Sequence, residues 1–246
     1  MKACVIIPAR YNSSRLPGKP LLHLLDKPMI IWVAEIASKA VGNENVFIAT
    51  DDTRICNIVS QSGFTFIMTS NLASTGTDRV AEASLGLNYD IFINVQGDEP
   101  LVCPEDILRC INHKKKYPDS IINSYNIINK DQDPYSINIP KVVVNNSDDL
   151  IYISRSLVPG YKDLNLKPES YFKQVCIYGY NKKELTKFLD FGGKSKLEKA
   201  EDIEILRFFE LGCPIKMFKS SNISLSVDVV EDIENVERHL RLRNGC

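Results

Sequence analysis

Three cations stand close together in a short, turn-rich stretch near the start of the chain. Arg10, Arg15 and Lys19 lie within PARYNSSRLPGKP, residues 8–20, directly after an apolar run. Two guanidinium groups and one ammonium group, with the backbone N–H groups near Gly18, would form a local receptor for a polyphosphate. The stretch is not a Walker A motif, because Ser13 and Pro20 stand where that motif needs Gly and Ser or Thr. Solvated charges on a loop are the simpler alternative. Three cations together favour a phosphate site, and a triphosphate with its metal is the expected ligand.

Carboxylates follow a later apolar run in INVQGDEP, residues 93–100, where Asp98 and Glu99 come after Gly97. Mg²⁺ takes oxygen ligands and commonly bridges one or two carboxylates to substrate phosphates. Gly-Asp with a following Pro is also ordinary turn chemistry. The metal site is favoured because a cationic loop, residues 8–20, is expected near these carboxylates. Asp228, after another apolar run, could complete the metal shell or cap a helix that begins near Glu231, and the sequence leaves this open.

Composition limits the classes of partner. The chain has 246 residues, with 30 basic and 31 acidic side chains and a net charge of -1, so no global field draws it to nucleic acid or to an anionic membrane. Its seven cysteines are scattered without a C-x-x-C pair, which predicts reduced thiols in a cytoplasmic protein. The longest apolar segment is interrupted by Glu35 and Lys39, well short of a membrane span.

Strands and helices alternate in the first half of the chain. Apolar runs at 3–8, 45–50, 64–69 and 90–95 predict buried strands, and helical patterns follow at 26–42, 51–63, 77–87 and 104–116. Such an order predicts an α/β fold with a mostly parallel sheet and helices on both faces. Ligands bind at the carboxyl ends of the strands in such sheets, which is where the cationic loop begins.

The pattern changes after residue 117. Runs at 120–128, 139–146, 150–154 and 174–180 predict strands without full helices between them, and hence an antiparallel or mixed extension of the sheet. Helices are expected again at 194–212 and 230–245. We therefore expect one domain, 1–246, with an excursion at about 132–175.

Eight segments in the same order give the chain a resemblance to a known family. They are VIIPARYNSSRLPGKPL, STGTDRVAEA, NVQGDEP, NIPKVV, SRSLVP, IYGY, EILR and VDVVEDIE. Together they resemble the CMP-Kdo synthetases, the cytidylyltransferases that activate 3-deoxy-manno-octulosonate (Kdo). The resemblance covers essentially the whole chain, and its first and third segments are the specific ones.

The resemblance implies a Rossmann-like nucleotidyltransferase fold, a homodimer formed through the excursion, and transfer of CMP from CTP to the anomeric hydroxyl of Kdo with release of pyrophosphate. The near-zero net charge adds the expectation of no nucleic-acid and no membrane partner. The pathway served, whether lipopolysaccharide, capsule or another glycan, stays open. In-line attack on the α-phosphorus needs charge neutralisation and orientation rather than covalent chemistry by the protein.

The same resemblance implies roles for individual residues. The CTP-binding set is Pro8, Ala9, Arg10, Arg15, Lys19, Ser74, Gly76, Arg79 and Gln96. The sugar-binding set is Gln96, Arg155, Gln174, Tyr178, Glu204 and Ile205. Asp98 and Asp228 would hold Mg²⁺, and the catalytic group would be Arg10, Arg15, Lys19 and Asp98.

The chain departs from the family pattern at five positions. Gln174 and Ala73 replace His, Ile205 replaces Gln, and Cys176 and Ser226 replace Gly. One interpretation is that the CTP half is intact while the acceptor is a Kdo relative, such as an 8-amino derivative or another ulosonic acid. The other is that Gln174 takes over the hydrogen bonding of the His and Ile205 lies beside the site.

Two rival functions also remain. One is a nucleotidyltransferase that uses another base. The other is a non-catalytic sensor of CTP or a sugar acid, against which Asp98 and Asp228 argue.

Overall fold

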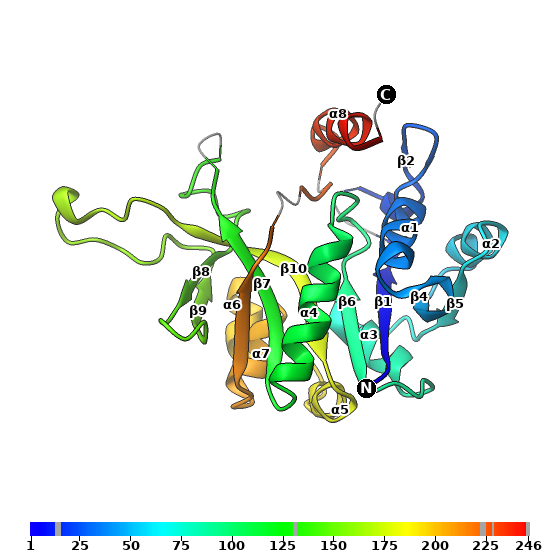
Figure 1. Ribbon diagram of the computed structural model, residues 1–246, viewed down its shortest axis with the longest axis horizontal. Helices are drawn as coiled ribbons and strands as arrows, with labels where there is room; N and C mark the ends of the chain where they lie inside the picture. Colours follow the sequence, from blue (N-terminus) through cyan, green and yellow to red (C-terminus); the bar gives the residue numbers. More distant parts are fainter. Residues whose placement is uncertain (13–15, 130–131, 222–224, 228, 245–246) are drawn as a thin grey trace.

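A twisted mixed sheet runs through the protein, with helices on both of its faces (Figure 1). The structure is a computed structural model, and it describes the chain except for residues 13–15, 130–131, 222–224, 228 and 245–246. Within the described residues the sheet has nine strands, of which seven follow the order β11-β7-β10-β6-β1-β4-β5. The remaining two, β8 and β9, form a hairpin that pairs with β10.

The first half of the chain builds the parallel part of this sheet. The strands are β1 (Ala3–Ala9), β4 (Val46–Thr50), β5 (Thr65–Met68) and β6 (Ile91–Val95), and the helices are α1 (Met29–Val41), α2 (Thr53–Gln61), α3 (Gly76–Ser84) and α4 (Pro104–Lys116). β1 pairs in parallel with both β4 and β6. Its central residues are fully buried because α1 and α4 cover one face of the sheet and α3 lies against the other. The predicted α/β fold with a mostly parallel sheet is confirmed.

The second half adds a mixed extension. Its strands are β7 (Ile121–Ile127), β8 (Lys141–Val144), β9 (Leu150–Ser154), β10 (Phe172–Tyr180) and β11 (Ile215–Lys219), and its helices are α5 (Lys182–Asp190), α6 (Lys196–Glu201), α7 (Ile205–Glu210) and α8 (Asp232–Asn244). β10 runs antiparallel to β6 and to β7, as the sequence indicated, while β11 is parallel to β7.

Three details of this half were not predicted. α5 and β11 were missed, and the helix expected over 194–212 is divided into α6 and α7. The break falls at Asp202, whose φ of 50° lies in the left-handed region and ends α6. None of the described helices is both long and apolar enough to cross a membrane.

Shorter elements complete the description. β2 (His23–Leu24) and β3 (Lys27–Pro28) form a small ribbon before α1, and single 3-10 turns lie at η1 (Lys19–Leu21), η2 (Asn43–Asn45) and η3 (Leu164–Leu166). The segment between β9 and β10, yellow-green in Figure 1, extends away from the sheet. It forms the outer part of the expected excursion.

A small third core joins the cationic loop to the end of the chain. Leu16 and Leu24 pack there with Trp32 of α1 and with Val236 and Leu240 of α8. Figure 1 places α8 at the end of the sheet opposite the N-terminus, which is the end where β1 and β6 terminate. Hydrophobic packing therefore fixes the loop after β1 against a helix that lies more than two hundred residues later in the sequence.

Candidate active site

Two cavities open side by side beyond the carboxyl ends of β1 and β6. The β1 compartment, about 320 Å³, is bounded by the loop after β1 and the start of α3. The β10 compartment, about 460 Å³, is bounded by β10 and by the segments around Arg155 and Ser226. Gln96, Asp98 and Glu204 line both. These three side chains form the boundary across which ligands in the two cavities would meet.

Close backbone approach brings the carboxylate loop to the cationic loop. A Cβ on Gly97 would lie 2.8 Å from the carbonyl oxygen of Pro8, so only glycine allows the chain after β6 to pass this close to the end of β1. Gly18 adopts φ 71°, and its N–H donates to the carbonyl of Tyr11 at 2.9 Å, which closes the cationic loop. Glycines at these two points bring the two predicted charge clusters within reach of each other.

Lys19 and Asp98 meet in the β1 compartment. Lys19 Nζ donates to Asp98 Oδ2 at 2.6 Å, with 11% of the lysine side chain and 32% of the aspartate side chain exposed. Pro8, Ala9, Arg10, Gly76 and Gln96 line the same cavity. Arg15 lies outside the described residues, so its position beside Lys19 stays a prediction.

A second chain segment reaches Asp98 from the C-terminal part of the protein. The N–H of Val227 donates to the carbonyl oxygen of Asp98 at 3.0 Å. Asp228, the other predicted metal ligand, lies outside the described residues. Among the residues that are described, no group of three His, Cys, Asp or Glu side chains is arranged to hold a metal ion. A Mg²⁺ that bridges one carboxylate to phosphates and keeps several waters needs no such group.

Two residues of the predicted CTP set do not line either cavity. Ser74 donates to Asp78 Oδ2 at 2.6 Å at the start of α3. Arg79 is fully buried, forms an ion pair with Asp51 at 3.0 Å, and donates to the hydroxyl of Thr69. Burial lowers the pKa of Arg79, and Asp51 acts in the opposite direction. Arg79 therefore ties α3 to the ends of β4 and β5 and lines neither cavity, and its part in binding the nucleotide stays a prediction.

Glu204 caps a helix at the boundary between the cavities. Its carboxylate accepts from the N–H groups of Gly76 at 2.9 Å and Thr77 at 2.7 Å, at the N-terminus of α3. Burial raises the pKa of Glu204, while hydrogen bonds from Thr77 and Gly76 act against that rise. A carboxylate suits a helix N-terminus because the helix dipole is positive there. Glu204 thus lines the β10 compartment, as expected of a sugar-binding residue, but both of its carboxylate oxygens accept hydrogen bonds from the start of α3.

Ile205, the next residue, was expected in the sugar pocket and is instead in the core. It is fully buried in the cluster that includes Leu206 and Phe208. Each residue of an α-helix is rotated by about 100° from the one before, so a residue that follows one at the cavity faces elsewhere. The expectation that Ile205 changes the sugar pocket is wrong.

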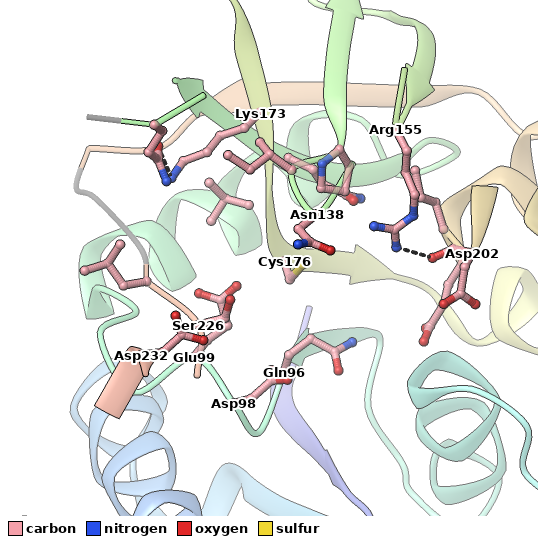
Figure 2. A pocket seen from close by; sticks show the side chains of 18 of the residues that line it. Gln96, Asp98, Glu99, Asn138, Arg155, Lys173, Cys176, Asp202, Ser226 and Asp232 are labelled. Carbon is pink, nitrogen blue, oxygen red and sulfur yellow. Dashed lines mark hydrogen bonds between the residues drawn. The ribbon is translucent and has the colours of Figure 1, made fainter. Parts of the chain in front are cut away.

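The β10 compartment contains the remaining predicted sugar residues (Figure 2). Gln174 and Tyr178 of β10 line it, together with Arg155. The Arg155 guanidinium donates to the carbonyls of Ile137 at 2.9 Å and Asp202 at 3.1 Å, which hold it in place. The same cavity is also lined by Lys173, Asn138 and Asp232, for which the sequence predicted no role.

Cys176 also lines this cavity, between Gln174 and Tyr178 on the same face of β10. The period of two along a strand would have identified it. Burial, followed by the charge of Glu99, raises the pKa of Cys176 well above that of an ordinary thiol. A protonated thiol is a poor nucleophile, in agreement with a reaction that requires none.

The sheet and the divided crevice at its carboxyl edge define a nucleotidyltransferase of the α/β class. A cavity lined by Arg10 and Lys19 adjoins a second polar cavity, and the two share the carboxylates of Asp98 and Glu204. The family model described as cytidylyltransferase matches residues 4–221. The chain belongs to this cytidylyltransferase family, as the sequence predicted.

Curated relatives are similar over the full chain. A 3-deoxy-manno-octulosonate cytidylyltransferase of Thermodesulfovibrio yellowstonii is 40% identical, with 98% of each chain covered. An 8-amino-3,8-dideoxy-manno-octulosonate cytidylyltransferase of Shewanella sp. (strain W3-18-1) is 42% identical, with 98% of this chain and 99% of the relative covered. A solved structure of CMP:2-keto-3-deoxy-manno-octonic acid synthetase complexed with CTP is 36% identical, with a TM-score of 0.90 and 99% and 100% of the two chains covered.

Proposed function

We propose that this protein transfers CMP from CTP to the anomeric hydroxyl of 3-deoxy-manno-octulosonate, or of its 8-amino relative, and releases pyrophosphate. One observation carries the proposal: the β1 and β10 compartments adjoin at Asp98, and Lys19 lies 2.6 Å from that carboxylate. A nucleoside triphosphate fits the β1 compartment, and a sugar acid fits the β10 compartment. The names of the relatives support both substrates.

The protein's part in this reaction is to neutralise charge and to orient two reactants. Arg10 and Lys19 would bind the phosphates of CTP, with the Pro8 and Ala9 backbone beside the nucleotide. In-line attack by the anomeric hydroxyl on the α-phosphorus then forms the new P–O bond as the bond to pyrophosphate breaks. Holding both reactants at the shared boundary supplies the orientation on which this kind of catalysis depends.

Asp98 fits a magnesium site, because its carboxylate lies between the phosphate-binding cations and the β10 compartment. Asp228 is proposed as a second ligand. When bound, Mg²⁺ would neutralise phosphate charge and make a coordinated hydroxyl easier to deprotonate.

The sugar acid would lie in the β10 compartment. Arg155 and Lys173 offer positive charge to its carboxylate, and Gln174 and Tyr178 offer hydrogen bonds to its hydroxyls. Glu204 forms the wall toward the nucleotide.

The choice between the two acceptors depends on a smaller set of residues than the sequence suggested. Of the five departures from the family pattern, Gln174, Cys176 and Ser226 line the β10 compartment, whereas Ile205 is in the core and Ala73 lines neither compartment. Relatives with each acceptor in their names are similar to this chain at 40% and 42% identity. Sequence similarity therefore does not decide which of the two sugar acids is the acceptor.

Pyrophosphate release tests the proposal. Purified protein is incubated with each of CTP, UTP, GTP and ATP, with 3-deoxy-manno-octulosonate or its 8-amino analogue, and with Mg²⁺ or EDTA. We expect release only with CTP, an acid and Mg²⁺ together. Release with another nucleotide, or none with either acid, would contradict the proposal.

We further propose a cytoplasmic homodimer that associates through the excursion. Large apolar side chains are exposed there, including Ile137 at 68%, Leu164 at 77% and Leu166 at 70%. Exposed apolar groups in one region are typical of an interface. The six described cysteines are all free, as expected in a reducing compartment.

A further inference from the structure

The wall of the β10 compartment contains an irregularity in β10. The register with β7 shifts between Val175 and Tyr178, so that Val175 pairs with Ser124 and Tyr178 with the adjacent Asn123. Residues 176 and 177 therefore have no partner residue on β7, while Ile177 keeps its pairing with Val95 of β6. Carbonyls at a bulge lose their regular partners and need others.

Asn123 supplies those partners. Its Nδ2 donates to the carbonyl oxygens of Val175 at 3.0 Å and Ile177 at 2.9 Å, and the hydroxyl of Ser124 also donates to Val175 at 3.1 Å. Asn123 and Ser124 are both fully buried. Two carbonyl oxygens on one side fix which end of the Asn123 amide is nitrogen, because only the NH₂ group can donate to them. Its oxygen must therefore face the other way.

The Asn123 oxygen in turn fixes Gln174. Gln174 Nε2 donates to Asn123 Oδ1 at 3.0 Å and to the hydroxyl of Tyr178 at 3.2 Å, which uses both of its hydrogens. The opposite orientation would place the Gln174 oxygen against the Asn123 oxygen at the same distance, with two acceptors and no hydrogen between them. The hydrogen-bond directions leave Oε1 as the end of the amide available to the compartment, and no residue in the described part of the chain donates to it.

We propose that Asn123 is a positioning residue that makes Gln174 present a hydrogen-bond acceptor, so that this wall selects sugar acids that carry a hydroxyl or ammonium donor there. The inference rests on the proposed function, since it assumes that the acceptor acid occupies the β10 compartment. A carbonyl or carboxylate at this point of the ligand would meet lone pairs on Oε1. The acid's own carboxylate is thereby directed to Arg155 and Lys173, on other parts of the wall.

A cycle of enzyme variants and acceptor analogues tests this. Gln174→Met keeps the length of the side chain and removes the acceptor. Each protein is assayed for kcat/KM with 3-deoxy-manno-octulosonate, with its 8-amino analogue, and with a series of analogues that each lack one hydroxyl. We expect wild-type protein to prefer the parent acid over one particular deoxy analogue by about tenfold, the value of one neutral hydrogen bond. In Gln174→Met that preference should fall to about one, while the KM for CTP is unchanged.

Asn123→Ala should reduce the same preference although Asn123 does not line the cavity. Ser124→Ala is the matched control: it also removes a bond to the Val175 carbonyl, but it leaves Asn123 and Gln174 paired and should keep the wild-type preference. A residue with a merely structural role would change the melting temperature without changing preference between analogues. If Asn123→Ala does not fold, the Gln174→Met cycle still decides whether Gln174 presents the selecting acceptor, and an unchanged preference there overturns the inference.

The outcomes separate this inference from the proposed function. Equal losses on every acceptor with Gln174→Met, or an unchanged preference, overturns the inference while turnover by wild-type protein upholds the function. No turnover by wild-type protein with either acid overturns both. If the 8-amino acid alone loses its advantage in Gln174→Met, the selected donor is the ammonium group; otherwise it is the hydroxyl whose removal matches the variant.

Discussion

Asp98→Asn is expected to raise the affinity for CTP in the absence of metal and to lower turnover in the presence of Mg²⁺. The Asp98 carboxylate accepts a hydrogen bond from Lys19 Nζ at 2.6 Å, and Lys19 is also a proposed phosphate ligand. A CTP phosphate must therefore compete with Asp98 for Lys19 when no metal is present. Removing the carboxylate removes the competitor and its repulsion of the phosphates. Metal-free CTP should bind more tightly, whereas turnover with Mg²⁺ should fall.

The magnitude follows from the geometry of the pair. Two unit charges at about 3 Å attract by about 6 kcal/mol at an effective dielectric of about 20. The net value is smaller because 32% of the Asp98 side chain is exposed, and a charge-assisted hydrogen bond contributes about 1.5 to 3 kcal/mol. The Asn side chain retains about 1 kcal/mol of this as a neutral bond. The remaining 0.5 to 2 kcal/mol, roughly, corresponds to a 2- to 30-fold increase in metal-free affinity.

Isothermal titration with CTP, in EDTA and in Mg²⁺, measures both effects. Turnover with Mg²⁺ should fall by about 100-fold or more, because the metal loses its described carboxylate. Asp149→Asn is the control, since Asp149 forms an ion pair of equal length with Lys216 away from the crevice, and it should leave both affinities unchanged. Raising the salt concentration should reduce the gain. If metal-free CTP binds Asp98→Asn no better than wild-type protein, the competition argument is refuted.

Three further predictions concern the fold, the thiol and the assembly. Asp78 forms an ion pair with Arg207 at 2.6 Å. Burial would raise the pKa of Asp78, but Arg207 and hydrogen bonds from Ser74 and Thr75 together lower it. The ionised carboxylate therefore stabilises the fold above the ordinary Asp pKa, and this stabilisation is lost as the pH falls below about 3.9. Asp78→Asn should cost about 3 to 5 kcal/mol in denaturant unfolding at pH 7, and less once the pH is brought well below about 3.9. Cys176, with its raised pKa, should react with iodoacetamide at pH 7 at least about tenfold more slowly than free cysteine, as measured by peptide mass spectrometry. An equal rate would contradict the raised pKa. Leu164→Asp with Leu166→Asp should convert the proposed dimer to a monomer in light scattering, and an unchanged mass would place the interface elsewhere.

Much of the fold could be predicted because it depends on local patterns. Buried strands such as Ala3–Ala9 are continuous apolar runs, and amphipathic helices follow each of them in the first half of the chain. β11 was missed because IKMFK, residues 215–219, is short and its adjacent Met and Phe break the alternation that would mark a strand. The break between α6 and α7 depends on a left-handed Asp202, which is a conformation that a helical pattern does not reveal.

The site was predictable where a residue's position follows from the end of a strand. Lys19 and Asp98 follow β1 and β6, and neighbouring parallel strands end at one edge, so their meeting could be derived from order alone. Arg79 could not be placed in this way. It lies within α3, and the direction of a helical side chain depends on how the helix is rotated against the sheet, which the sequence did not specify.

Glu204 and Ile205 are adjacent at the start of α7, but their side chains point to different places. This difference determines which residues can set acceptor specificity. The Glu204 carboxylate reaches the N-terminus of α3 and borders both cavities, while Ile205 faces the core. An Ile at this position therefore removes no hydrogen bond from the sugar pocket. Gln174 does line the pocket, and buried Asn123 determines which atom it presents. Because a hydrogen-bonded wall discriminates by the direction of its donors and acceptors, a change of amide orientation would alter acceptor choice as strongly as a change of residue.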